Sequence, residues 1–179
     1  FNASVGFAGS YGLTGAVGFT FNNFSIDEPL KGGGGQILNF SWEFGQANRI
    51  QNINLGFSEP WLFDEPTTVG FNIYDSRINY YINLRRTGIA LNLGRRFKWP
   101  DNYFRGDWSL IFQRNNVGEE YTGSYYRPGL STEITMSQTF SRNSVDNLFF
   151  PTSGSRFSLS TQFAMGALGL GNTDYFKNQ

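Results

Sequence analysis

The stretch QILNFSWEFG, residues 36–45, decides the fold of this chain. Successive side chains of an extended strand point to opposite faces, so polar and apolar residues separate cleanly here. One face would carry four bulky apolar side chains, those of Leu38, Phe40, Trp42 and Phe44. The other face would carry Asn39, Ser41 and Glu43. Such a strand fits either the core of a soluble β-sandwich or the lipid-facing wall of a membrane barrel.

The same alternation recurs in eight further segments, around residues 3–7, 17–21, 53–57, 69–73, 89–93, 108–112, 130–136 and 157–163. Glycine interrupts most of them and aromatic or β-branched residues dominate, which disfavours helices and favours strands. We expect the apolar members of the central segments to face lipid: Leu38, Phe40, Trp42, Phe44, Ile53, Leu55, Phe57, Val69, Phe71, Ile73, Ile89, Leu91, Leu93, Trp108, Leu110 and Phe112.

The composition narrows the function classes. The chain has 179 residues, 18% of them aromatic, and its 14 basic and 14 acidic residues cancel, so charge does not indicate a nucleic-acid partner. It has no cysteine and no histidine, which excludes disulfides and thiolate metal sites and removes the commonest general base. We therefore expect no enzyme, metal or cofactor. No run of 18 apolar residues predicts a membrane-spanning helix, so a membrane protein of this sequence would be built from strands.

The connections between the predicted strands favour a barrel over a sandwich. Every second connection combines proline with aromatic residues, in FNNFSIDEPLKGGGG, SEPWLFDEP, RFKWPDNYF and VDNLFFPTSG. The others are mostly polar. An up-and-down meander sends alternate turns to the same rim, whereas Greek-key crossings give no reason for this sorting.

A length estimate agrees with the barrel. Arg85 and Arg86 precede one strand, and Arg95 and Arg96 follow it. The nine residue steps from Arg86 to Arg95 at a tilt of about 40° span roughly 23 Å, close to the ~25 Å apolar band of outer-membrane barrels. In lipid an open sheet edge leaves backbone groups unpaired, so the sheet must close. Nine strands and TDYFKNQ at 173–179, which suggests a tenth, predict the N-terminal portion of a larger antiparallel up-and-down transmembrane β-barrel.

Two further motifs have plainer explanations than a ligand site. DEP occurs at residues 27–29 and 64–66, where paired carboxylates could bind calcium, but turn chemistry is the simpler interpretation. Glycines 32–35 lack the lysine and hydroxyl residue of a phosphate-binding loop.

FSEPWLF at 57–63 and FFPTSGSRFSLS at 149–160 resemble the BamA-type outer-membrane protein insertase family, with FPTSGSR at 150–156 as the best marker. The resemblance covers all 179 residues and implies the first part, strands one to nine and the start of ten, of a sixteen-stranded barrel. The family's POTRA domains, its RGF-type loop and its C-terminal strands are absent from this chain, which we expect to be a piece of the whole. TamA-type assembly factors and two-partner secretion translocators share the same barrel.

By this resemblance, the protein folds and inserts proteins into the bacterial outer membrane by templating substrate strands at a lateral seam beside strand one. The implied partners are outer-membrane lipids, unfolded outer-membrane protein substrates and accessory lipoproteins. The backbone edge expected to pair with substrate comprises Asn2, Ala3, Ser4, Val5, Gly6, Phe7 and Ala8. An interfacial aromatic girdle on the periplasmic side is expected from Trp61, Phe63, Trp99, Phe149 and Phe150.

Three alternatives remain open. The first is a related translocator of the TamA or two-partner secretion type. The second is a passive porin, whose constriction loop would have to use Glu119, Glu120 and Arg127. The third is a soluble carbohydrate-binding sandwich that stacks sugars on Tyr125 and Tyr126.

Overall fold

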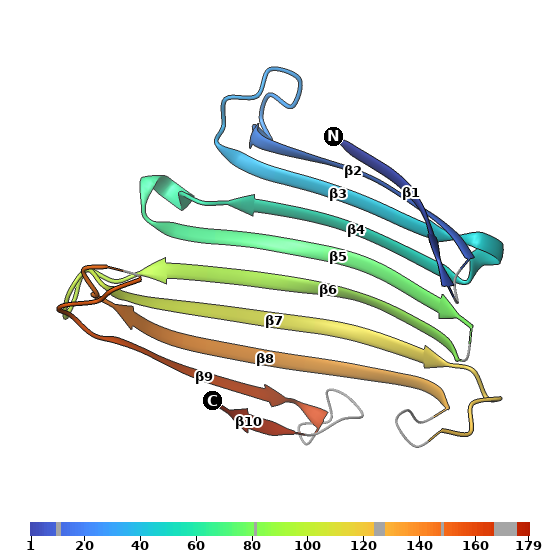
Figure 1. The fold of residues 1–179 in the computed structure, drawn as a ribbon. Helices are drawn as coiled ribbons and strands as arrows, with labels where there is room; N and C mark the ends of the chain where they lie inside the picture. The colour runs from blue at the N-terminus through green and yellow to red at the C-terminus, as the bar shows by residue number, and fades with distance from the viewer. Residues whose placement is uncertain (10–11, 81, 124–127, 148, 167–174) are drawn as a thin grey trace.

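The computed structural model describes residues 1–9, 12–80, 82–123, 128–147, 149–166 and 175–179. Its strands all belong to one ten-stranded sheet (Figure 1). The strands are β1 (Asn2–Ala8), β2 (Gly12–Phe24), β3 (Gln36–Gly45), β4 (Ile50–Glu59), β5 (Thr67–Asn79), β6 (Asn83–Arg96), β7 (Phe104–Val117), β8 (Gly129–Asn143), β9 (Arg156–Ala164) and β10 (Phe176–Asn178). Two three-residue 3-10 turns interrupt the connections, η2 (Gln46–Asn48) and η3 (Leu62–Asp64).

The strand order is sequential and every neighbouring pair is antiparallel. The sheet is therefore an up-and-down meander, and its turns alternate between two rims (Figure 1). The four proline-aromatic connections follow β2, β4, β6 and β8, so they share one rim, as the sequence predicts. We call this the aromatic rim and the opposite one the polar rim.

The register separates the two faces as the alternation predicts. Leu38 on β3 lies beside Phe57 on β4, which lies beside Phe71 on β5 and then Leu91 on β6. Each of these residues has at least one apolar neighbour two positions along its own strand. In the described part of the chain no second sheet covers this apolar face, and Trp42, Leu55 and Leu91 remain 41%, 37% and 43% exposed. The sandwich alternative is therefore wrong.

The apolar band crosses the registered rows diagonally. On β3 the band runs from Leu38 to Phe44, whereas on β6 it is centred on Leu91, which lies in the row of Leu38. The centre thus moves by about three residues, or about 10 Å, over three inter-strand spacings of about 14 Å in total. For this band to lie parallel to the membrane plane, the strands would have to tilt by about 35° from the barrel axis. This tilt is within the range of membrane barrels.

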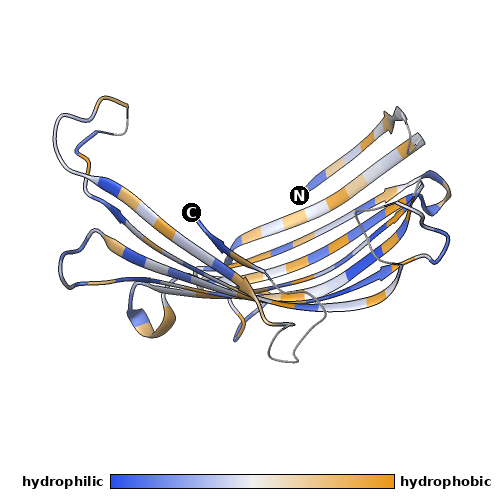
Figure 2. Ribbon diagram, turned by 90° about the horizontal axis from the view of Figure 1, so that it is seen from below, coloured by the Kyte–Doolittle hydropathy of each residue, from blue (hydrophilic) through white to orange (hydrophobic). Residues whose placement is uncertain are grey.

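The sheet is curved, with its polar face on the concave side. One open hollow is lined both by Asn39 on β3 and by Thr139 on β8. Six strands in a flat sheet would hold these residues about 24 Å apart, so the sheet must bend toward the polar face to enclose a single hollow. Figure 2 shows the resulting trough and the alternation of apolar and polar residues along its strands.

The pairing of β6 with β5 and β7 assigns the arginines at its two ends to faces. Arg86 lies in register with Ser76 and Asn115 on the polar face, whereas Arg95 lies on the apolar face with Leu93. The two arginines that bracket the apolar stretch of β6 on one face are Arg85 and Arg95. Consecutive arginines at 85–86 make the period-two parity ambiguous in sequence, and only the pairing with β5 resolves it.

In the described residues, no helix has the length and hydropathy required to cross a membrane.

Candidate functional site

The free edge of β1 is the first candidate site. Throughout the described residues β1 pairs with β2 alone, from Asn2 opposite Gly18 to Ala8 opposite Gly12. Its other edge carries backbone groups without a strand partner there, and β1 lies at one border of the sheet while β10 lies at the other (Figure 1). Val5 and Phe7 point to the apolar face and are each 78% exposed.

Few side-chain contacts hold β1 against β2. Four of its seven partner positions in β2 are glycine or alanine: Gly12, Gly15, Ala16 and Gly18. Cross-strand pairs of larger side chains contribute roughly 0.2–1 kcal/mol each relative to alanine pairs, and most such pairs are missing here. The β5–β6 pair, in contrast, sets Phe71 against Leu91 and Ile73 against Ile89. The β1 seam therefore depends mainly on backbone hydrogen bonds.

The edge of β1 also lacks the residues that usually protect an exposed strand. Natural edge strands are commonly blunted by lysine, proline or inward-pointing charges. The sequence of β1, NASVGFA, contains none of these. Its edge is therefore chemically open to another strand.

The apolar face forms a continuous aromatic and aliphatic surface. Phe19 stacks on Phe40 with ring centroids 5.4 Å apart, and Phe57 stacks on Phe71 at 5.8 Å. The register places every residue predicted to face lipid on this one face. Contact of the face with lipid stays a prediction.

The five predicted girdle residues all lie in turns of the aromatic rim. Trp61 and Phe63 lie between β4 and β5, Trp99 between β6 and β7, and Phe149 and Phe150 between β8 and β9. Their exposures range from 60% to 88%, so they do not anchor their loops over a core. Their role at a membrane interface remains a prediction.

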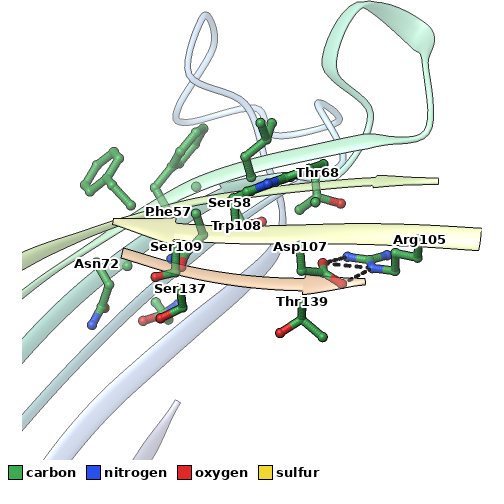
Figure 3. Close-up of a pocket in the computed structure, with 17 residues that line it drawn as sticks. Phe57, Ser58, Thr68, Asn72, Arg105, Asp107, Trp108, Ser109, Ser137 and Thr139 are labelled. Carbon is green, nitrogen blue, oxygen red and sulfur yellow. Dashed lines mark hydrogen bonds and ion pairs between the residues drawn. The ribbon is translucent and has the colours of Figure 1, made fainter. Parts of the chain in front are cut away.

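The concave polar face contains interactions that the sequence did not indicate. Tyr74 on β5 donates a hydrogen bond of 2.7 Å from its hydroxyl to Gln113 Oε1 on β7, across the intervening β6. Arg105 and Asp107 on β7 form an ion pair of 2.7 Å. Figure 3 shows Thr139 near that pair, with Ser137 and Asn72 further along the strands.

Glycines on β6 make room for both of these interactions. A Cβ at Gly88 would lie 2.6 Å from the Tyr74 hydroxyl, and one at Gly94 would lie 2.5 Å from the Arg105 guanidinium. The space above each glycine is thus occupied by a side chain from a neighbouring strand. The alternation pattern in the sequence assigns these glycines to the polar face. It does not show which side chain of a neighbouring strand covers each of them.

A hydrogen-bond network ties two turns of the aromatic rim to β8. Arg142 donates to Asp101 Oδ2 through Nε at 2.9 Å and through Nη2 at 2.8 Å. It also donates to Ser144 Oγ at 2.8 Å and to Ser155 Oγ. Desolvation would raise the pKa of the Asp101 carboxyl, but hydrogen bonds from the Tyr103 amide and from Arg142 outweigh it and hold that pKa below its usual value.

The turn that carries the family marker FPTSGSR is organised by Asp146. Its carboxylate accepts hydrogen bonds from the Thr152 hydroxyl and from the amides of Thr152 at 2.9 Å and Ser153 at 3.1 Å. These bonds lower the pKa of Asp146 to about 2. Gly154 has a φ of +96° and packs against the Ser144 carbonyl, a conformation and a space that admit only glycine without strain. The geometry of this turn therefore explains why the marker has glycine at position 154.

The acidic residues of the two DEP motifs lie in turns. Asp64 and Glu65 belong to the turn around η3, where Glu65 pairs with Arg95 at 2.7 Å, and Glu28 pairs with Lys31 at 2.7 Å. Among the residues that the structure describes, no cluster of three acidic side chains could hold a metal ion. Tyr125, Tyr126 and Arg127 lie outside the described residues.

A single antiparallel meander with an apolar convex face and a polar concave face is the wall of a β-barrel of the bacterial outer-membrane class. Residues 32–179 match the model of the Omp85 superfamily domain, and the chain belongs to this superfamily. No curated protein was found to match the chain.

Among solved structures the chain is similar to the crystal structure of BamA from Haemophilus ducreyi lacking POTRA domains 1–3. The TM-score is 0.55 at 17% sequence identity, and the match covers 90% of this chain and 34% of the BamA chain. The chain therefore spans about a third of the length of that structure. The resemblance seen in sequence is confirmed at the level of the superfamily: an outer-membrane barrel of the protein insertion and translocation family, which is not an enzyme family.

Proposed function

We propose that this chain belongs to an outer-membrane protein assembly factor that templates substrate strands on the free edge of β1. The observation that carries the proposal is the combination of an unprotected edge with a β1–β2 pairing that rests on glycine and alanine partners. In this proposal residues 1–179 form the first strands of a larger barrel, and POTRA domains and the C-terminal strands belong to the rest of the protein. The coverage of only 34% of the BamA chain supports this.

The physical principle is β-augmentation. A strand added to a sheet edge gains main-chain hydrogen bonds that do not depend on its side chains, so one edge can accept many different substrates. The backbone from Asn2 to Ala8 would supply these bonds, with Val5 and Phe7 toward lipid. A closing seam made with such an edge would exchange readily for a substrate strand, because little side-chain packing is lost.

Placement in the membrane is part of the same proposal. The apolar face would contact lipid, the concave polar face would line the lumen, and the aromatic rim would lie at the periplasmic interface. The tilt of about 35° deduced from the diagonal apolar band supports this placement. Accessory lipoproteins would bind the periplasmic side.

Site-specific crosslinking tests the role of β1. The chain has no native cysteine, so single cysteines can be placed in turn from Asn2 to Ala8 in the full-length protein. With a stalled outer-membrane substrate that carries a cysteine in its final strand, we expect crosslinks with a period of two residues. The matched control is Ile53→Cys on β4, which is paired on both sides by β3 and β5 and should give no crosslink.

Assembly that proceeds normally without any crosslink along β1 would rule out the template role. It would leave the superfamily assignment untouched.

A translocator is the second candidate, favoured by the polar concave face. The hollow lined by Asn39, Asn72, Asp107 and Thr139 could border an aqueous path for an unfolded chain. Single-channel recording separates the two functions: a translocator or porin should conduct through the polar lumen, and Asn92→Trp, at an exposed position that lines the hollow, should narrow that path and reduce conductance. An insertase should keep its assembly activity in this variant.

A further inference from the structure

A groove on the apolar face at the polar rim carries an unusual cluster of arginines. It has a volume of about 650 Å³ and is lined by Arg85, Thr87, Ile89, Phe112, Arg114 and Leu130 of β6, β7 and β8. These residues share the outward face, since Arg85 lies opposite Asn116, Thr87 opposite Arg114, and Ile89 opposite Phe112. The groove therefore opens away from the lumen.

The charge in this region is positive. The two outermost rows of the face run Arg77–Arg85–Asn116–Leu130 and Asp75–Thr87–Arg114–Thr132. They contain three arginines and one acidic residue. Asp75 is already engaged, since it accepts hydrogen bonds from Arg85 Nε at 2.9 Å and from Thr87 Oγ1 at 2.5 Å. Within the described residues, Arg114 has no hydrogen bond or ion pair and its side chain is exposed.

The three arginines outnumber the one carboxylate that can neutralise them, since Asp75 is the only acidic residue in these two rows. Arg77 and Arg85 are direct cross-strand partners, and like charges directly opposite each other destabilise a sheet. Arg114 occupies the diagonal position relative to Arg85, about 7–8 Å away between backbones, a distance that two arginine side chains can close around one phosphate. Guanidinium groups bind phosphate oxygens through paired N–H donors.

Apolar residues begin directly beside the charges. Ile89 and Phe112 form the next row, followed by Leu91 and Leu110, and Leu130 borders the groove from β8. A ligand that fits the whole groove must combine a phosphate with long apolar chains running along the strands. This describes a lipid with a phosphate headgroup, located in the membrane leaflet at the polar rim.

We infer that this groove is a binding site for a phosphomonoester-bearing membrane lipid, held by Arg85 and Arg114 with its acyl chains on Ile89 and Phe112. The inference rests on the proposed contact between the apolar face and lipid. It adds a specific lipid site that the template role of β1 does not need.

The test uses the full-length protein in nanodiscs of phosphatidylcholine that contain phosphatidic acid as the phosphomonoester probe. Native mass spectrometry then measures how much phosphatidic acid stays bound relative to phosphatidylcholine. We expect wild type to retain phosphatidic acid selectively and the double variant Arg85→Gln/Arg114→Gln to lose roughly thirty-fold of this selectivity. The matched control is Arg86→Gln, which removes the same charge from the neighbouring position on the polar face and should keep it.

The single variant Arg114→Gln tests the site even if the double variant does not fold. Arg114 has no polar partner in the described residues, so its replacement breaks no hydrogen bond or ion pair there. It should lower the selectivity about five-fold. Equal selectivity in wild type and the double variant, or an equal loss in Arg86→Gln, would overturn the site. Complete displacement of phosphatidic acid by an equal concentration of inorganic phosphate would overturn its assignment to a lipid.

The measurement contains no protein substrate, so it is independent of the crosslinking test on β1. A protein that assembles substrates normally but shows no lipid selectivity contradicts this inference alone. A protein that binds phosphatidic acid selectively but gives no crosslink contradicts only the template role.

Discussion

Tyr74 on β5 reaches over Gly88 on β6 to donate a hydrogen bond to Gln113 on β7, so the tyrosine ring fills the space that a side chain at position 88 would need. Three strands are thereby connected on the concave face by one side chain. An aromatic ring packed over a glycine is a known way to fix the register of a curved sheet. The relationship shows why a glycine belongs in the middle of a fourteen-residue strand.

Gly88→Ala should destabilise the barrel. The new Cβ would lie 2.6 Å from the Tyr74 ring and 2.8 Å from the Phe112 carbonyl, and backbone at that distance cannot yield easily. We expect a loss of about 1–3 kcal/mol in the free energy of unfolding, measured by urea titration in lipid vesicles. Gly6→Ala is the control, because no atom lies within 4 Å of a Cβ there. A loss no larger than that of the control would show that Tyr74 is not fixed by the glycine.

Two neighbouring residues of β6 should differ in how strongly a lysine substitution destabilises the inserted protein. Leu91 and Asn92 are both exposed in the isolated chain, so burial within the protein predicts little difference between them. If the apolar face meets lipid, Leu91→Lys should cost about 2–4 kcal/mol and Asn92→Lys much less. The measurement is the fraction of folded, inserted protein after refolding into vesicles. Similar yields for the two variants would contradict the assigned orientation of the faces.

The four tryptophans of the chain should report different depths in the bilayer. Trp42 lies within the apolar band of β3 and Trp108 near the end of the band on β7, whereas Trp61 and Trp99 lie in turns of the aromatic rim. In single-tryptophan variants, lipids brominated deep in the acyl chain should quench Trp42 most strongly. Lipids with a quencher at the headgroup should quench Trp61 and Trp99 most. Strong deep quenching of Trp99 would remove it from the girdle.

The turn between β8 and β9 should be sensitive to acid at a defined pH. The folded pKa of Asp146 is lowered from 3.8 to about 2 by the Thr152 hydroxyl and the amides around it. A carboxyl with a lowered folded pKa stabilises the fold above its unfolded pKa, and this stabilisation is lost as the pH falls through the folded value. The loss should therefore occur between about pH 4 and pH 2.

A carbon-13 NMR titration of the Asp146 carboxyl checks this, with an expected midpoint near 2. Asp146→Asn should weaken the turn at neutral pH and abolish its response in that acid range. A midpoint at the ordinary aspartate value would mean that the Thr152 and Ser153 hydrogen bonds do not persist in solution.

The sequence was sufficient to predict which residues of a strand share a face of the sheet. It was not sufficient to predict which residues of neighbouring strands lie opposite each other. Period-two alternation identifies which residues share a face within one strand, as at Leu38 to Phe44, because the geometry of an extended chain is fixed. The order of strands followed from the chemistry of the turns. The pairing of one strand with the next depends on contacts distant in sequence, so only the structure places Arg86 on the polar face and Arg95 on the apolar face.

The candidate sites divide in the same way. The edge at Asn2 to Ala8 was named from the family resemblance, and its role in pairing with substrate stays a prediction. The Tyr74–Gln113 bond and the arginine groove were not predictable from the sequence, since each joins residues of different strands whose proximity only the register determines. A glycine in mid-strand was the available signal for Tyr74, because such glycines often mark a close approach of another group.

The glycine and alanine positions of β2 opposite β1 have one more consequence, which concerns selectivity. Main-chain amides and carbonyls are the same in every polypeptide, so an attachment made through them cannot distinguish one client from another. Recognition of the correct client would then fall to other parts of the protein, and β1 would contribute only the generic step that is common to all of them.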